Sequence, residues 1–192
     1  MKYHMANMLT PSLYVAMNEL SNHDHSRFLT RTNHMVGRVD KLGYESASEY
    51  TNEAVMREAV IMQMTWVGAP TVYYGDEAGV CGFTDPDNRR TYPWGHENHE
   101  LIAFHKDIIR IHKESEALRY GSLEILLGEE NLLAYGRFTE TEKVIIIIHN
   151  RSELSEVTVP VWRAEVPMKC KMQSNIYSYE HGYKMDSEQY LV

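Results

Sequence analysis

The feature that most constrains the fold is an apolar strand, an amphipathic helix and a second apolar strand, in that order. The segment from Leu13 to Leu20 is mostly apolar and stops at the polar cluster from Ser21 to Arg27, as a buried strand does at a functional rim. The run from Thr71 to Tyr74 is β-branched and aromatic, and Gly75-Asp76-Glu77 ends it. We therefore expect strands at Leu13–Leu20 and Thr71–Tyr74, each followed by polar residues.

The segment between these strands has helical periodicity. Ser46 and Glu49 have the spacing of a capping box, and apolar residues then recur at intervals of four, three and four. These apolar residues are Val55, Ala59, Met62 and Trp66. Gly68 and Pro70 are typical stop signals. The pattern predicts a helix over residues 47–66 whose apolar stripe packs in the core.

Strand, helix and strand, with polar residues after each strand, is the order found in parallel sheets. Chemistry in such sheets collects at the carboxyl ends of the strands. The polar residues expected at this edge are His23, Asp24, Asp76 and Glu77.

The chain changes character near residues 115–121. Before this point, apolar residues at intervals of three, four and three predict a second helix over residues 98–113; they are Leu101, Phe104, Ile108 and Ile111. After Gly121, short apolar runs separated by turn residues predict an antiparallel all-β module. The expected strands are Leu123–Leu127, Leu132–Phe138, Lys143–His149 and Val157–Val161.

Composition excludes several classes of function. The net charge is −8, from 19 Lys plus Arg against 27 Asp plus Glu, and basic residues do not cluster, so neither nucleic acid nor a membrane surface is an expected partner. Two cysteines, Cys81 and Cys170, cannot form a disulfide framework and lack zinc spacing, and we expect free thiols in a reducing, cytoplasmic compartment. His23 and His25 would point to opposite faces of an extended chain, so no metal site is expected.

Several strings occur together in a characteristic order. They are Asn22-His23-Asp24 with Arg27-Phe28, then Ala69 to Glu77 (APTVYYGDE), Asp85 to Arg90 (DPDNRR) with Pro93-Trp94, and Ala117 to Gly121 (ALRYG). Each is weak alone, but together they resemble the α-amylase family of glycoside hydrolases, in particular its neopullulanase, cyclomaltodextrinase and maltogenic amylase branch.

The resemblance implies an α/β part followed by an all-β part. Residues 1–116 would be the C-terminal portion of a (β/α)8 TIM barrel, containing strands 7 and 8. Residues 117–192 would be a C-terminal antiparallel β-sandwich, which we expect to be incomplete.

The family's reaction is retaining hydrolysis or transfer at α-glucosidic bonds, with an oxocarbenium-like transition state. The resemblance makes Asp24 the transition-state stabiliser, and it makes His23, Asp85 and Arg89 substrate-binding residues. Many members have threonine directly after the His-Asp pair, where this chain has His25-Ser26, and this departure concerns the shape of the subsite rather than the class.

The resemblance also implies that important parts are missing. The family's nucleophilic aspartate and acid/base glutamate lie on barrel strands 4 and 5, and the residues before Leu13 leave no room for those strands. We expect a fragment that is inactive alone. Its partners would be an α-glucan oligosaccharide and the missing N-terminal barrel half. Because members of the branch commonly dimerise, the resemblance also implies a second copy in a homodimer. No cofactor is required; calcium in the parent enzyme is left open.

Other interpretations stay open at this point. Asp76 and Glu77 could be catalytic, but carboxylates at such a rim more often accept backbone hydrogen bonds. Asp85-x-Asp87 starts like a calcium loop, but Arg89 and Arg90 stand where further ligands would be needed. The alternative function is a non-catalytic carbohydrate-binding or assembly module built on the β-sandwich.

Overall fold

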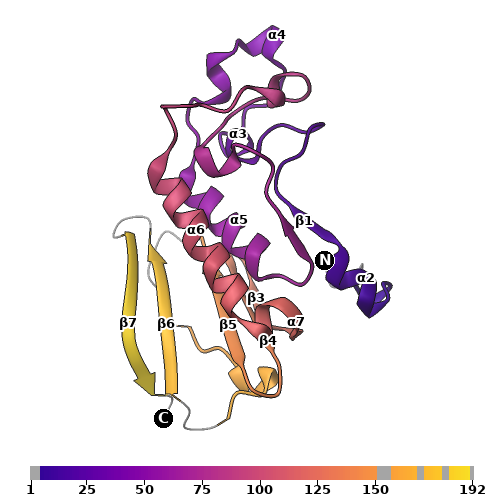
Figure 1. Cartoon of the computed structure of the whole chain (residues 1–192), viewed down its shortest axis with the longest axis vertical. Coiled ribbons are helices and arrows are strands. Elements are labelled where there is room, and N and C mark those ends of the chain that lie inside the picture. Colours follow the sequence, from indigo (N-terminus) through magenta and orange to yellow (C-terminus); the bar gives the residue numbers. More distant parts are fainter. Residues whose placement is uncertain (1–4, 151–156, 168–170, 179–181, 191–192) are drawn as a thin grey trace. The chain divides into compact units, whose positions relative to one another are not determined.

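The computed structural model describes residues 5–150, 157–167, 171–178 and 182–190, with side chains up to residue 167. The chain forms two compact units, Met1–Gly121 and Ser122–Val192, shown in Figure 1. Among the described residues, no helix is long and apolar enough to cross a membrane.

The first unit contains the predicted parallel strand pair. Strand β1 (Met17–Glu19) pairs with β2 (Ala69–Thr71), and the register runs from Met17 opposite Ala69 to Glu19 opposite Thr71. Helix α5 (Glu53–Thr65) connects them. Gln63 of α5 donates hydrogen bonds to the carbonyl oxygens of Asn18, at 3.0 Å, and Thr71, at 2.7 Å, so one side chain joins the helix to both strands.

Both strands are shorter than predicted. Residues Thr10–Val15 form helix α2 instead of the start of the first strand, because Pro11 in its first turn has a fixed φ that suits a helix N-terminus. The second strand ends at Thr71, where the ladder with β1 ends, so Val72 to Tyr74 lie outside it. The predictions at Leu13–Val15 and Val72–Tyr74 were therefore wrong.

The start of α5 also differs from the prediction. Ser46 belongs to a short 3-10 helix, η1 (Glu45–Ala47), and its hydroxyl donates to the carbonyl oxygens of Leu42 and Gly43. The cap is Asn52, whose Oδ1 accepts hydrogen bonds from the amides of Ala54 and Val55 at 3.0 and 3.2 Å. The capping-box prediction was wrong because a serine hydroxyl can satisfy a preceding turn just as well.

The buried face of α5 is not the predicted stripe. Its buried residues are Met56, Val60, Gln63, Met64 and Thr65, whereas Val55, Ala59 and Met62 are only partly buried. Trp66, directly after the helix, is buried as predicted. The apolar residues of α5 are distributed over several faces of the helix, so periodicity alone did not identify the face that packs.

Helix α6 (His99–Glu114) lies within one residue of the predicted bounds. Its N-terminus is capped by Asn98, whose Oδ1 accepts from the Leu101 amide at 2.9 Å. Leu101, Phe104 and Ile108 are buried as predicted, while Ile111 is partly exposed.

The unit ends with helix α7 (Glu116–Tyr120). Further short helices of this unit include α3 (Phe28–Arg31), α4 (Val39–Leu42), η2 (Asp76–Ala78) and η3 (Asp87–Arg89).

The second unit is built from antiparallel strands, as predicted. Strands β3 (Ser122–Glu129), β4 (Leu132–Phe138) and β5 (Lys143–His149) form one sheet in that order, and the bounds of β4 and β5 match the prediction. Strands β6 (Lys171–Ser178) and β7 (Gly182–Tyr190) form a second antiparallel pair.

The strand predicted at Val157–Val161 is absent, and a 3-10 helix, η4 (Val161–Ala164), follows Pro160. The amide of Val161 donates to the Val159 carbonyl oxygen at 2.8 Å, so this backbone closes a local turn and not a ladder. Ala164 of η4 packs in a core with Leu126 and Ala134.

Cys81 of the first unit is a buried free thiol, and Cys170 lies outside the described residues.

Replacement of Asn52 by alanine should destabilise the first unit by about 1 kcal/mol, because two amides at the start of α5 lose their acceptor. Glu49→Ala is the matched control: Glu49 is exposed, and it should change stability by less than about 0.5 kcal/mol. Urea unfolding followed by circular dichroism measures both. A larger loss of stability in Glu49→Ala than in Asn52→Ala would support the capping box and contradict the structure.

Candidate functional site

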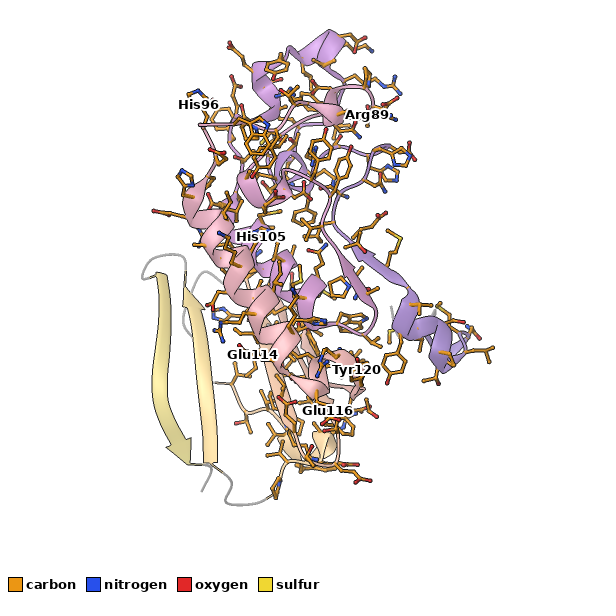
Figure 2. All side chains as sticks on the ribbon, viewed as in Figure 1. Arg89, His96, His105, Glu114, Glu116 and Tyr120 are labelled. Carbon is orange, nitrogen blue, oxygen red and sulfur yellow. The ribbon has the colours of Figure 1, made fainter. Side chains whose placement is uncertain are left out.

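Polar side chains gather in three segments of the first unit. The first follows β1, from Leu20 to Arg27; the second follows β2, from Val72 to Ala78; and the third is the loop Gly79–Gly95, which contains η3. Figure 2 shows Arg89 in this part of the first unit, at the end opposite Glu114 and Glu116. The three segments contain all four side chains predicted to act on a substrate.

Arg27 connects these three segments from the interior. Its side chain is fully buried, and its Nε donates to the Asn88 carbonyl oxygen at 2.8 Å. Its Nη1 donates to the Tyr74 carbonyl oxygen at 2.5 Å and to Asp76 Oδ1 at 3.0 Å. The guanidinium also lies 4.0 Å from the ring centroid of Tyr73, a cation–π distance. A planar, permanently charged group with several fixed donors is well suited to joining several segments.

The Arg27–Asp76 ion pair is buried on both sides, with side-chain exposures of 0% and 6%. Burial raises the pKa of the Asp76 carboxyl, and hydrogen bonds from Ser21 and Arg27 oppose that rise. Such a pair is expensive to break, because removal of either partner leaves an uncompensated charge in the interior. Asp76 therefore has a structural position, held by hydrogen bonds from side chains, whereas the rim interpretation predicted backbone donors.

Asn88 makes a second connection between the loops. It is fully buried, and its Nδ2 donates to the carbonyl oxygens of Asn22, at 3.1 Å, and His25, at 2.8 Å. These two carbonyl groups flank the His23-Asp24 pair on either side. One amide side chain from η3 thus fixes the backbone on both sides of the predicted catalytic aspartate.

The loop that contains His23 and Asp24 is also ordered from within. Asn22 Oδ1 accepts hydrogen bonds from the amides of Asp24 and His25 at 3.0 and 3.1 Å, and Asn22 Nδ2 donates to Glu19 Oε1 at 2.8 Å. This Asx turn leaves the His23 and Asp24 side chains free to face solvent, with exposures of 64% and 66%. His23 Nε2 lies 3.4 Å from Asp24 Oδ1.

Asp85 and Arg89 form an exposed ion pair in the third segment. Arg89 Nε lies 2.5 Å from Asp85 Oδ1, and about half of each side chain is exposed. The amide of Asp85 donates to the carbonyl oxygen of Asp24 at 3.5 Å, so the backbones of the two predicted substrate-binding segments are in contact. A carboxylate and a guanidinium side by side present acceptors and donors of the kind that bind vicinal hydroxyl groups.

Arg27 and Asn88 stand in the strings that resemble the family, but no local pattern singles out either residue. A buried arginine has no signature in composition or periodicity, because arginine is usually exposed. Among the described residues, no group of three or more His, Cys, Asp and Glu side chains could hold a metal ion.

The first unit matches a known family. Residues 1–119 match the family model described as "Alpha amylase, catalytic domain". An amylopullulanase of Thermoanaerobacterium thermosulfurigenes is 39% identical over 187 residues, which are 90% of this chain and 10% of that protein. A cyclomaltodextrinase of Thermoanaerobacter pseudethanolicus is 36% identical over 141 residues, 72% of this chain and 22% of that protein. The chain thus spans less than a quarter of either relative.

Solved structures show the same fold. The debranching enzyme from Nostoc punctiforme superposes with a TM-score of 0.72 at 23% identity, over 99% of this chain and 36% of that one. An α-amylase from Geobacillus thermoleovorans, in complex with acarbose, has a TM-score of 0.71 at 25% identity, over 99% of this chain and 39% of that one.

Replacement of Arg27 by methionine should destabilise the first unit by about 3–5 kcal/mol, because Asp76 is left buried without its counter-charge. The double variant Arg27→Met/Asp76→Leu should recover a large part of that loss, since no buried charge then remains. Chemical denaturation measures both variants. Arg27→Met within about 1 kcal/mol of the unaltered chain would show that the pair is not a structural constraint.

Proposed function

This chain belongs to the α-amylase family of glycoside hydrolases, and on that premise we propose that its exposed rim residues bind an α-glucan and assist cleavage of its α-glucosidic bonds. The observation that carries the proposal is the backbone contact between the Asp24 and Asp85 segments, which carry an exposed carboxylate and a half-exposed carboxylate–guanidinium pair. The substrate class is that of the similar proteins: maltodextrins, cyclodextrins or pullulan.

The proposed place of the chain in the whole enzyme follows from its strands. Within the described residues β1 and β2 pair only with each other, in parallel, and α5 connects them. We propose that they are strands 7 and 8 of a (β/α)8 barrel, that residues 1–116 belong to that barrel, and that residues 117–192 belong to a C-terminal β-sandwich. The other barrel strands would then lie against the open edges of β1 and β2.

Asp24 is proposed to stabilise the transition state. A retaining glycosidase builds positive charge on the sugar ring as the leaving group departs. A carboxylate that accepts hydrogen bonds from ring hydroxyls binds more strongly as that charge develops, so it stabilises the transition state more than the ground state. Asp24 suits this role because its side chain is exposed while its backbone is fixed by Asn22 and Asn88.

The other three residues are proposed to hold the sugar. His23, next to Asp24, can donate a hydrogen bond to a hydroxyl of the same ring, and its role is orientation. Asp85 and Arg89 would bind a glucose unit one or two positions towards the non-reducing end. Both partners are half exposed, so binding would exchange water for sugar hydroxyls without dismantling the buried core.

The nucleophile and the acid/base are proposed to come from outside this chain. They require two carboxyl groups about 5–5.5 Å apart across the scissile bond. Among the family's strings present here, only the His-Asp pair carries a catalytic carboxylate, and Asp76 is engaged by Arg27. We expect the chain to be inactive alone and to act with the N-terminal half of the barrel.

Complementation tests this function. The chain is co-expressed with the preceding barrel half of the Thermoanaerobacter pseudethanolicus cyclomaltodextrinase, and sugar release from maltodextrin is measured. Asp24→Asn should lower the rate by roughly a hundredfold or more, because the charge that meets the oxocarbenium ion is lost. Asp40→Asn makes the same chemical change at an exposed position in α4 and should leave the rate unchanged. Equal rates for the two variants would refute the role of Asp24.

A non-catalytic carbohydrate-binding function is the second candidate. The observation that favours it is Trp162 of η4, which is 73% exposed in the second unit. Maltooligosaccharide binding that is lost in Trp162→Ala and unaffected by Asp24→Asn would support this candidate over the catalytic one.

A further inference from the structure

Two aromatic side chains lie together on the loop between η3 and α6. The ring centroids of Tyr92 and Trp94 are 4.5 Å apart, with an angle of 48° between the ring planes. Trp94 is 79% exposed, although burial of a tryptophan side chain is more favourable in free energy than burial of most other side chains. Single exposed aromatics are ordinary, but two in mutual contact form a continuous aromatic surface.

Hydrogen bonds hold this pair in place. The Trp94 amide donates to the Tyr92 carbonyl oxygen at 2.9 Å, and the His96 amide donates to the Pro93 carbonyl oxygen at 2.8 Å. Desolvation and the charge of the Glu77 carboxylate, in η2, raise the pKa of the Tyr92 hydroxyl. The exposed tryptophan therefore lies on a hydrogen-bonded turn, which reduces the entropy lost when a ligand binds.

A carboxylate accompanies the aromatic surface. Hydrogen bonds from the backbone of Glu97 and Gly95 lower the pKa of the Glu97 carboxyl, so it stays an anionic acceptor. The loop is also continuous with the proposed sugar site, since Arg89 lies three residues before Tyr92. Tyr74 Oη donates to the Arg90 carbonyl oxygen at 2.8 Å, which fixes the loop between the two positions.

We propose that Tyr92 and Trp94 form a stacking platform for a further glucose ring of the bound α-glucan. One face of a glucopyranose ring is lined by C–H groups while its hydroxyls point outward, so an aromatic face covers the apolar part and leaves the hydroxyls to water and Glu97. The proposal rests on the proposed function, because it takes the same α-glucan as ligand. It differs in naming residues that bind sugar beyond His23, Asp24, Asp85 and Arg89.

Fluorescence makes the platform directly testable. The chain has three tryptophans, of which Trp66 is buried and Trp94 and Trp162 are exposed. Maltoheptaose is titrated into the full chain while tryptophan emission is recorded, and affinity is checked by calorimetry. Trp94→Ala should weaken binding by about tenfold and abolish most of the emission change, and Trp94→Phe should restore part of the affinity. Tyr50→Ala removes another exposed aromatic side chain of the first unit and is the matched control, which should bind as the unaltered chain does. Trp162→Ala tests whether the sugar is bound in the second unit.

The outcomes separate the platform from the proposed function. If Trp94→Ala binds like the unaltered chain while Arg89→Ala does not, the platform is refuted and the rim site remains. If only Trp162→Ala loses binding, the sugar is held in the second unit and both ideas fail. Absence of any binding by the unaltered chain also overturns the platform. The proposed function is tested independently by Asp24-dependent sugar release in the complementation experiment. Unchanged circular dichroism in each variant shows that folding is not the cause.

Discussion

A guanidinium group with no exposed surface must find its counter-charge and its hydrogen-bond acceptors inside the protein. Arg27 finds a carboxylate and a carbonyl group in the segment after β2 and a carbonyl group in the loop that contains η3, while its Nη2 has no hydrogen-bond partner among the described residues. The first unit therefore cannot bury Arg27 unless three segments that are distant in the sequence come together. The same segments carry the exposed side chains of the proposed site, so the site depends on the interactions that bury Arg27.

The residues that position the site differ from the residues proposed to act in it. Arg27, Asp76 and Asn88 are buried and hydrogen bonded to other protein groups, whereas Asp24 and Arg89 face solvent. This division suits a sugar-binding surface, because hydroxyl groups compete with water and need acceptors and donors that are fixed in advance. Loops without their own regular structure are fixed here by side chains that contact the backbone of neighbouring loops.

The sequence predicted whatever depended on local patterns. Strand, helix and parallel strand, the bounds of α6, and strands β4 and β5 all followed from periodicity and turn residues, and the family followed from the ordered strings. The start of α5 did not, because Ser46 and Asn52 are both good caps and only the tertiary fold selects between them. The buried face of α5 and the clamps made by Arg27 and Asn88 depend on contacts between distant segments, which no local pattern records.

The buried Asn88 side chain fixes the backbone on both sides of Asp24. Hydrogen exchange of the Asp24 and His25 amides tests this clamp, since both amides donate to Asn22, whose backbone carbonyl group accepts from Asn88. In Asn88→Ala these two amides should exchange at least about tenfold faster, while amides in the middle of α6 keep their rates. Unchanged exchange at Asp24 and His25 would contradict the account, because the loop would then be ordered without its clamp.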